Sequence, residues 1–183
     1  MDREKDDCMA FLIQASNPRQ TGIFDEADYN LSMAIETVFP MNTEDALIVW
    51  NHIRIPLSYK YDLSCMMDDI IDMLQKLRML SAGKTVIRWP SNTFEGTWDM
   101  EWDGTKLRID SSWENVVGGV GDLLNANSKL VISKLDFISE WKEVLGNVIL
   151  GLERSGYSVD RLKDIDALVG EFISIERAGI LYR

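Results

Sequence analysis

The chain has 183 residues, 46% of them hydrophobic and 27% charged, which is typical of a folded chain and excludes a disordered one. Its formal net charge of −11 disfavours contact with phosphate backbones, so we expect no nucleic-acid partner. A single domain over residues 1–183 is expected, because no repeat, low-complexity tract or long linker divides the sequence.

The first part of the chain predicts short strands and one short helix. The apolar run at residues 8–15 fits a strand or a helix, and residues 28–38 fit a helix or an extended segment. Residues 46–50 and 52–59 are rich in β-branched and aromatic side chains and predict two strands. Pro56 lacks a backbone N–H, which places the second strand towards a sheet edge.

A longer amphipathic helix is predicted from Ser64 to about residue 80. Ser64 is a suitable N-cap, and Gly83 is a natural C-terminal stop. The apolar stripe of this helix consists of Met67, Ile70, Ile71, Leu74 and Leu77. A strand at residues 85–89 follows the helix.

The next segment predicts a β-hairpin at about residues 93–113, with Asp103-Gly104 as its turn. Asp-Gly is a strong signal for a type I′ turn, because both central residues need a positive φ. Since side chains alternate along a strand, the apolar residues then share one face. The predicted pairs on that face are Trp102 with Thr105, Met100 with Leu107, Trp98 with Ile109 and Phe94 with Trp113.

The opposite face of the predicted hairpin carries charged side chains. With the same turn, Glu101 faces Lys106, Asp99 faces Arg108 and Glu95 faces Ser112. Each pair of opposite charges is worth about 0.2–1 kcal/mol. We therefore expect Asp99 and Glu101 to be matched by bases, whereas Glu95 has no charged neighbour.

The last third of the chain predicts one strand and two helices. Residues 114–128 are rich in glycine and asparagine and predict a mobile connection to a strand at 129–133. Apolar residues recur at helical spacing over residues 138–152 and 162–175. Together the elements predict an α+β fold, an antiparallel sheet with helices packed on one side, including two C-terminal helices. At least four of the six tryptophans are expected in the core.

The sequence favours a cytoplasmic location. The N-terminus opens with acids and has no basic region ahead of its short apolar stretch, so no signal peptide is expected. No apolar run approaches the roughly 20 residues that cross a bilayer, so we expect no membrane insertion. Cys8 and Cys65 are too few for a disulfide framework and fit reduced thiols.

No catalytic or cofactor motif is complete. Gly83-Lys84-Thr85 is similar to the end of a phosphate-binding loop, but Arg78 stands where that loop needs a glycine. His52 is the only histidine and lies in a strand-like run without a catalytic signature. One histidine and two distant cysteines offer no zinc spacing. We therefore expect no cofactor, no metal and no enzymatic activity.

An acidic stretch around the predicted long helix is the main candidate binding surface. It contains Asp62, Asp68, Asp69 and Asp72, and the first base after them is Lys76. The helix dipole accounts for acids near the start of the helix, but its effect weakens by Asp72. We expect Asp69 and Asp72 to bind a partner, without a base to match them and with Tyr61 and Met73 nearby to exclude water. Glu95 is the third candidate partner-binding residue.

Three stretches of the sequence carry a resemblance to a known class of proteins. They are IPLSYKYDLS (55–64) with the acidic helix after it, WPSNTFEGTWDMEWDG (89–104) and GILYR (179–183). The chain resembles the small acidic immunity proteins encoded beside bacterial polymorphic or contact-dependent growth inhibition toxins. The resemblance implies that it binds and neutralises a cognate toxin C-terminal domain in the cytoplasm. It assigns no binding residue.

Two other classes of function fit the sequence. One is an interaction or adaptor module unrelated to toxins, which would use the same acidic surface. The other is an enzyme with an unrecognised carboxylate site, because 30 acids make some carboxylate pair almost inevitable. A toxin gene immediately upstream would favour immunity, and desolvated carboxylates or His52 in a pocket would favour an enzyme.

Overall fold

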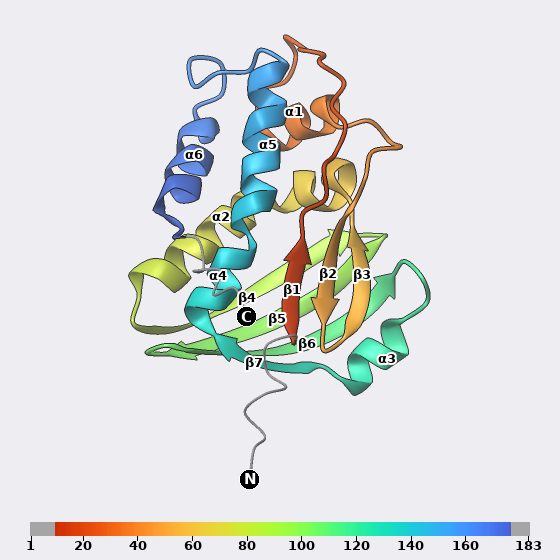
Figure 1. Cartoon of the computed structure of the whole chain (residues 1–183), viewed down its shortest axis with the longest axis vertical. Helices are drawn as coiled ribbons and strands as arrows, with labels where there is room; N and C mark the ends of the chain where they lie inside the picture. Colours follow the sequence, from red (N-terminus) through yellow and green to blue (C-terminus); the bar gives the residue numbers. More distant parts are fainter. Residues whose placement is uncertain (1–9, 177–183) are drawn as a thin grey trace, which may run out of the picture.

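The computed structural model describes residues 10–176 and has an α+β fold, with the hairpin and the C-terminal helices that the sequence predicts. The strands form two antiparallel sheets, of three and four strands, instead of one. The smaller sheet lies in front of the larger one in Figure 1, and most helices gather at the upper end of the molecule. Cys8 and the GILYR stretch lie outside the described residues.

The three-stranded sheet has the order β1 (Phe11–Gln14), β2 (Ala46–Trp50) and β3 (Ile53–Leu57), so Pro56 lies in an edge strand as predicted. His52 is not inside a strand. Asn51 and His52 form the two-residue turn between β2 and β3, with φ angles of 44° and 70°. Two positive φ values match a type I′ turn, for which asparagine at the first position is favourable.

The four-stranded sheet has the order β4 (Ala82–Ser91), β5 (Phe94–Asp103), β6 (Lys106–Val116) and β7 (Lys129–Ser133). Gly83 lies in β4, and so the prediction that it ends the preceding helix is wrong. A Cβ atom at Gly83 would lie 2.4 Å from Cζ2 of Trp102, the residue opposite it on β5. The glycine therefore makes room for a tryptophan ring of the core.

The register of the β5–β6 hairpin differs from the predicted one by two positions. Asp103 pairs with Lys106, and the loop consists of Gly104 and Thr105. Only Gly104 has a positive φ, 58°, which matches a type II′ turn with glycine first. The observed pairs are Trp102 with Leu107, Met100 with Ile109, Glu101 with Arg108 and Asp99 with Asp110. A shift of two keeps every side chain on its predicted face, and Trp98, Met100 and Leu107 are buried as expected.

The helices are α1 (Leu31–Val38), α2 (Ser64–Met79), α3 (Gly121–Ala126), α4 (Lys134–Glu140), α5 (Lys142–Arg154) and α6 (Asp164–Ser174). In Figure 1 the helices α1, α5 and α6 lie in the upper half of the molecule, whereas α3 lies at its lower right. Ser64 does not cap α2, because a π-helical turn (η2, Tyr59–Leu63) leads directly into it and Ser58 caps that turn. The helix predicted at 138–152 is two helices that meet at Trp141. Helix α3 lies within the segment 114–128.

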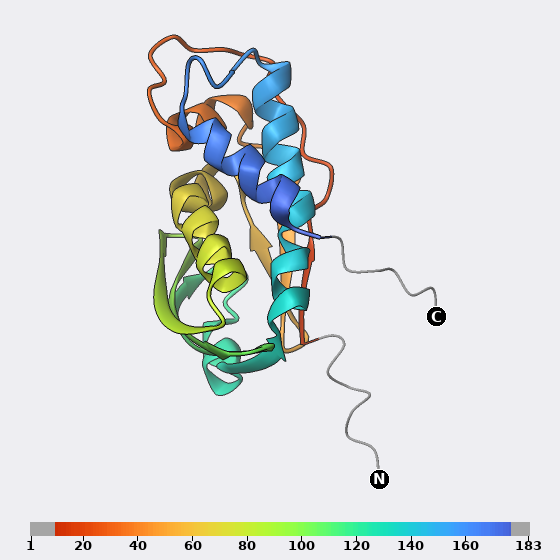
Figure 2. The same ribbon diagram turned by 90° about the vertical axis from the view of Figure 1, so that its left-hand side faces the viewer.

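The buried hydrophobic residues come from both sheets and from the helices. Figure 2 shows the two sheets as separate layers. All six tryptophans are buried, which confirms the expectation of at least four. The ring of Trp50 on β2 lies 5.3 Å from that of Trp98 on β5 and 5.5 Å from that of Trp113 on β6. Trp141, at the junction of α4 and α5, stacks 6.3 Å from Trp89. One aromatic cluster thus joins both sheets and the C-terminal helices.

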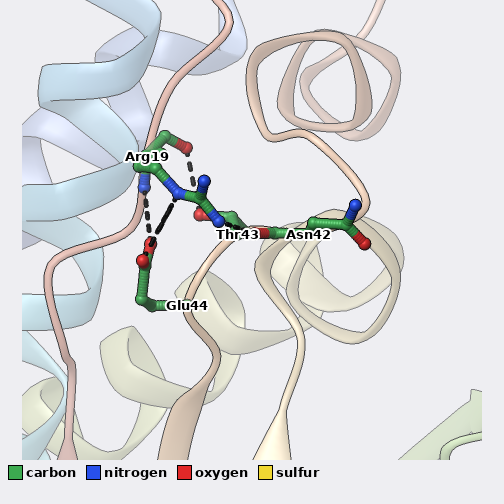
Figure 3. A network of polar contacts seen from close by, with 4 residues as sticks. All are labelled: Arg19, Asn42, Thr43 and Glu44. Atoms are coloured by element: carbon green, nitrogen blue, oxygen red, sulfur yellow. Dashed lines mark hydrogen bonds and ion pairs between the residues drawn. The ribbon is translucent and has the colours of Figure 1, made fainter.

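Arg19 fastens the loop after β1 to the loop before β2 (Figure 3). Its backbone N–H donates to Oε2 of Glu44 at 3.2 Å, and its Nε forms an ion pair with Oε1 at 3.3 Å. Its guanidinium also donates to the Asn42 carbonyl, and Thr43 donates to the Arg19 carbonyl. The pKa of Glu44 lies below its usual range because its carboxylate accepts from its own backbone N–H and from Arg19. The Arg19 side chain is therefore already bound to neighbouring loop residues.

Candidate protein-binding surfaces

One exposed side of η2 and α2 combines an aromatic ring with acids. We call it the α2 stripe, and it consists of Tyr61, Cys65, Asp68, Asp69 and Asp72. These residues recur at spacings of three and four, so they follow one another along a single side of the helix. Tyr61 is 43% exposed, enough for its ring to cover an interface. The other side of α2 is buried in the core.

The acids in the middle of the α2 stripe are not neutralised. Neither Asp68 nor Asp69 forms an ion pair within residues 10–176. The pKa of Asp68 is raised, first because its carboxyl is partly buried and then because Asp164 at the start of α6 and Asp69 lie close. Lys60 donates to the backbone carbonyl of Glu36, and its Nζ lies 5.9 Å from the centre of the Tyr61 ring. Lys76 pairs with Asp72, so Asp68 and Asp69 are the acids of the stripe without an ion pair in the described part of the chain.

The prediction for Asp72 is wrong in one respect. Its carboxylate forms an ion pair with Lys76, four residues further along α2. This is the favourable i, i+4 orientation on a helix, with the acid towards the N-terminus. Met73 is fully buried and does not reach the surface, so Tyr61 alone of the two predicted neighbours is exposed. Asp69 keeps the environment expected of it, and Asp72 does not.

Glu95 also has a different environment from the predicted one. The two-residue shift of the hairpin register places Ser112 opposite Thr97 instead, and a bulge between Phe94 and Gly96 interrupts the pairing at Glu95 itself. The Glu95 carboxylate accepts a hydrogen bond from Asn115 Nδ2 at 2.6 Å. Glu95 therefore has a partner on β6 and belongs to the four-stranded sheet, whereas Asp69 and Asp72 share one side of α2.

Asp62 lies beside the α2 stripe and Cys65 belongs to it, and neither is a charged surface group. Asp62 is 1% exposed, and its carboxylate accepts hydrogen bonds at 2.7 Å from the backbone N–H of Ser58 and from the Thr93 hydroxyl. It joins η2 to the β4–β5 turn and takes no part in the surface. Burial and the nearby Asp62 raise the pKa of the Cys65 thiol to about 11. Cys65 is therefore a neutral thiol at pH 7, not a nucleophilic thiolate.

A second surface lies on the outer face of the four-stranded sheet, which faces away from the smaller sheet (Figure 2). A hollow of about 490 Å³ crosses all four strands, and we call it the outer hollow. Its exposed lining residues are Lys84, Val86, Asp99, Glu101, Arg108, Asp110, Lys129 and Val131. The sequence did not predict this site, because the predicted register matched Asp99 with Arg108. The observed register places Asp99 opposite Asp110 instead.

His52 lies at a second, more polar hollow between the β2–β3 turn and the start of β7. The Asn51 amide donates to the carbonyls of Asn127 and Lys129 at 2.7 and 3.0 Å, which fixes the turn. None of the six residues that line this hollow is an acid or a cysteine. Ser128 lines it as well, but its hydroxyl donates to Asp110 at 3.0 Å, and no acid in the lining is placed to orient His52 as in a Ser-His-Asp triad.

Residues 10–176 contain neither a metal-binding cluster nor a membrane-spanning helix. Within that range, His, Cys, Asp and Glu side chains form no group of three or more that could hold a metal ion. None of the described helices combines the length and the apolar character needed to cross a membrane. No protein-family model, curated protein or solved structure matches the chain.

Proposed function

We propose that the protein is an immunity protein, which binds a basic toxin domain in the bacterial cytoplasm and neutralises it. The observation that supports this most is the α2 stripe, where exposed Tyr61 shares one side with the acids Asp68 and Asp69, which form no ion pair in the described part of the chain. An interface of this composition suits a cationic protein, because the ring excludes water while the acids meet bases. Charge pairs contribute more when they are desolvated than when they stay exposed.

The overall charge acts in the same direction. With a net charge of −11, the protein attracts a cationic partner over distances of about a Debye length, roughly 8–10 Å in physiological salt. Such steering raises the association rate, and it is reduced by added salt. Rapid capture suits a protein that must neutralise a toxin before the toxin acts.

The test is binding to the toxin domain encoded beside the gene, measured by calorimetry over a salt series. We expect wild type to bind, with weaker binding at high salt, and Asp68→Lys/Asp69→Lys to bind at least tenfold more weakly at low salt. The control is Glu26→Lys/Glu114→Lys, which changes the net charge equally at exposed acids outside the stripe. Steering alone predicts equal effects of the two variants, whereas direct contact predicts a larger loss for the stripe.

Protection of cells that express the toxin is the second measurement. Wild type is expected to protect, and the stripe variant is expected to protect less at the same protein level. Absence of both binding and protection with wild type would contradict immunity. Binding to a different protein would then favour an adaptor module, the other interpretation that this surface permits.

A further inference from the structure

Strand β4 lies at one edge of the four-stranded sheet, and the backbone groups on its outer side have no partner. The Gly104 N–H donates to the Ser81 carbonyl at 2.9 Å, and the same alternation along the ladder directs the odd-numbered residues of β4 towards β5. The N–H and C=O groups of the even-numbered residues therefore point away from the sheet. Within residues 10–176 these groups form no hydrogen bond, and those with both an N–H and a C=O are Ala82, Lys84, Val86 and Arg88.

The other strand edges are short or already occupied. On β1, which has four residues, the Ile13 N–H donates to the Glu140 carboxylate at 2.8 Å. On β3, which has five, the outward position at Pro56 has no N–H. Beyond the end of β7, the Asn125 amide binds both the N–H and the C=O of Trp113, at 2.8 and 2.9 Å. Strand β4 has ten residues, so it keeps the longest open edge in the described part of the chain.

The side chains along this edge define what can pair with it. Val86 is 50% exposed and lies between Lys84 and Arg88, two positions from each, on the outer face. Arg88 forms no ion pair within residues 10–176, and the pair of Lys84 with Glu101 is exposed and therefore weak. A strand added here would place its own side chains directly opposite these three. Acids would match the two bases, and a β-branched residue would match Val86.

The same bases disfavour other strands. Charged residues on an edge discourage pairing with strands that do not complement them. A second copy of this chain, aligned antiparallel at Val86, would set Lys84 of each copy opposite Arg88 of the other, and like charges directly opposite each other are destabilising. The edge is therefore selective as well as open.

We propose that β4 is a docking edge for an extended segment of a partner protein with the pattern acidic–x–β-branched–x–acidic, which joins the sheet as an additional strand. Backbone hydrogen bonds to the outward groups supply affinity, and the acids supply specificity. The pattern is the same in both directions, so it fits a parallel or an antiparallel strand. The net charge of −11 slows the approach of an acidic segment, but salt screens distant charges beyond about 8 Å, so Lys84 and Arg88 dominate at contact.

This inference concerns a different surface from the α2 stripe and does not rest on the proposed function. The test titrates the full chain with Ac-Thr-Glu-Thr-Val-Thr-Glu-Thr-NH₂ and with its counterpart in which lysine replaces both glutamates, followed by NMR in physiological salt. We expect the glutamate peptide to shift the amides of β4 and to bind at least tenfold more tightly than the lysine peptide. In Lys84→Glu/Arg88→Glu the preference should reverse, a result that an unfolded variant cannot give.

A second variant tests the backbone hydrogen bonds. Val86→Pro removes an outward N–H but no bond to β5, so the sheet should remain intact while the glutamate peptide binds at least tenfold more weakly. Val131→Pro is the matched control, because the Val131 N–H on β7 also points away from its neighbouring strand. It should bind the peptide as wild type does.

Several outcomes would overturn the proposal. They are binding of neither peptide to wild type, equal binding of both, or equal effects of the two proline substitutions. A wild-type dimer in sedimentation that Val86→Pro dissociates would assign the edge to a second copy and would also overturn it. If Val86→Pro does not fold, the reversed preference of Lys84→Glu/Arg88→Glu decides the question.

Discussion

The sequence predicted the inner face of the β5–β6 hairpin correctly and the charge pairs of its outer face incorrectly. On the inner face, Trp98, Met100 and Ile109 are buried, as the alternation of apolar residues indicated. On the outer face, the predicted partner of Asp99 was Arg108, whereas the structure places Asp110 there. The sequence predicted which side each residue takes but not which residue it faces.

The reason is that the face of a residue depends only on whether the register shift is even or odd, whereas its cross-strand partner depends on the exact register. A register shift of two residues returns each side chain to the same face, so burial is unchanged. Every cross-strand charge pair changes, because pairs depend on the exact partner. Gly104 can end the two-residue loop Asp103-Gly104 or begin the two-residue loop Gly104-Thr105. Which of these loops forms sets the register. Burial is thus robust to turn assignment, whereas surface electrostatics is not.

Removing an inner-face side chain should have the largest effect. Trp98 is fully buried among Trp50, Trp89 and Trp113. Trp98→Ala should lower the free energy of unfolding by about 3–5 kcal/mol, measured by urea denaturation. The Trp98 indole N–H has no hydrogen-bond partner within residues 10–176, so Trp98→Phe should cost clearly less. Asp99→Ala, one position along on the outer face, should cause no loss, and equal losses at 98 and 99 would contradict the assignment of faces.

Adding one carbon to the inner face should have a smaller effect. Gly83→Ala places a Cβ 2.4 Å from the buried ring of Trp102. We expect a loss of about 1–3 kcal/mol, because the ring must move within a packed core. The matched control is Gly170→Ala in α6, where a Cβ meets nothing within 4 Å. That substitution should stabilise by about 0.5–1 kcal/mol, since glycine is unfavourable inside a helix. If both Gly83→Ala and Gly170→Ala lowered the stability in thermal or urea unfolding, this account would be contradicted.

A charged group at the boundary between core and surface should show a pH-dependent effect. Burial raises the pKa of Glu140, although its carboxylate accepts a hydrogen bond from the Ile13 N–H at 2.8 Å. Its charge at neutral pH therefore costs folding energy, and wild type gains stability as the pH falls through the raised folded pKa towards the unfolded value. Glu140→Gln keeps an acceptor without the charge. It should be more stable at pH 7 by less than about 1 kcal/mol, because water screens part of the cost.

Urea denaturation of wild type and Glu140→Gln from pH 7 to pH 4 measures this difference. The advantage of the glutamine variant should shrink as the pH falls, because wild type then becomes neutral at this position as well. Glu140→Ala, which leaves the Ile13 N–H without this acceptor, should be less stable than Glu140→Gln at both pH values. An advantage that grew on acidification would contradict the raised pKa.

Local patterns predicted most elements of the fold, and long-range contacts set the rest. The strands at 46–50 and 129–133 and the apolar side of α2 follow from propensity and periodicity. The division into two sheets does not, because strand patterns carry no information on which strands share a sheet. The break at Trp141 is also invisible to periodicity, since apolar spacing continues through it while the ring turns towards Trp89.

The candidate surfaces were less predictable than the fold. Asp69 lies on an exposed helix side without an ion pair in the described chain, and the helical spacing was enough to indicate this. The Asp72–Lys76 pair also follows from i, i+4 spacing and was a signal that the sequence offered. The surroundings of Glu95 depended on the hairpin register and on a bulge, and those of the outer hollow depended on the register. The register could not be assigned without the turn geometry. Gly104 as the first loop residue was the one available indication.

The smallest predicted effect distinguishes the two registers by its sign. In the observed register, Asp99→Lys replaces two opposed acids with a lysine facing Asp110. We expect the variant to be more stable than wild type by about 0.2–1 kcal/mol, the range for a favourable cross-strand pair. In the register predicted from Asp103-Gly104, the same lysine would face Arg108, and the protein would be destabilised. Adding Asp110→Asn to Asp99→Lys should remove the gain in stability if the observed register holds. In the predicted register it should leave the loss of stability unchanged. Urea denaturation at low salt resolves the two signs, and a destabilised Asp99→Lys variant would contradict both the observed register and the opposed acids of the outer hollow.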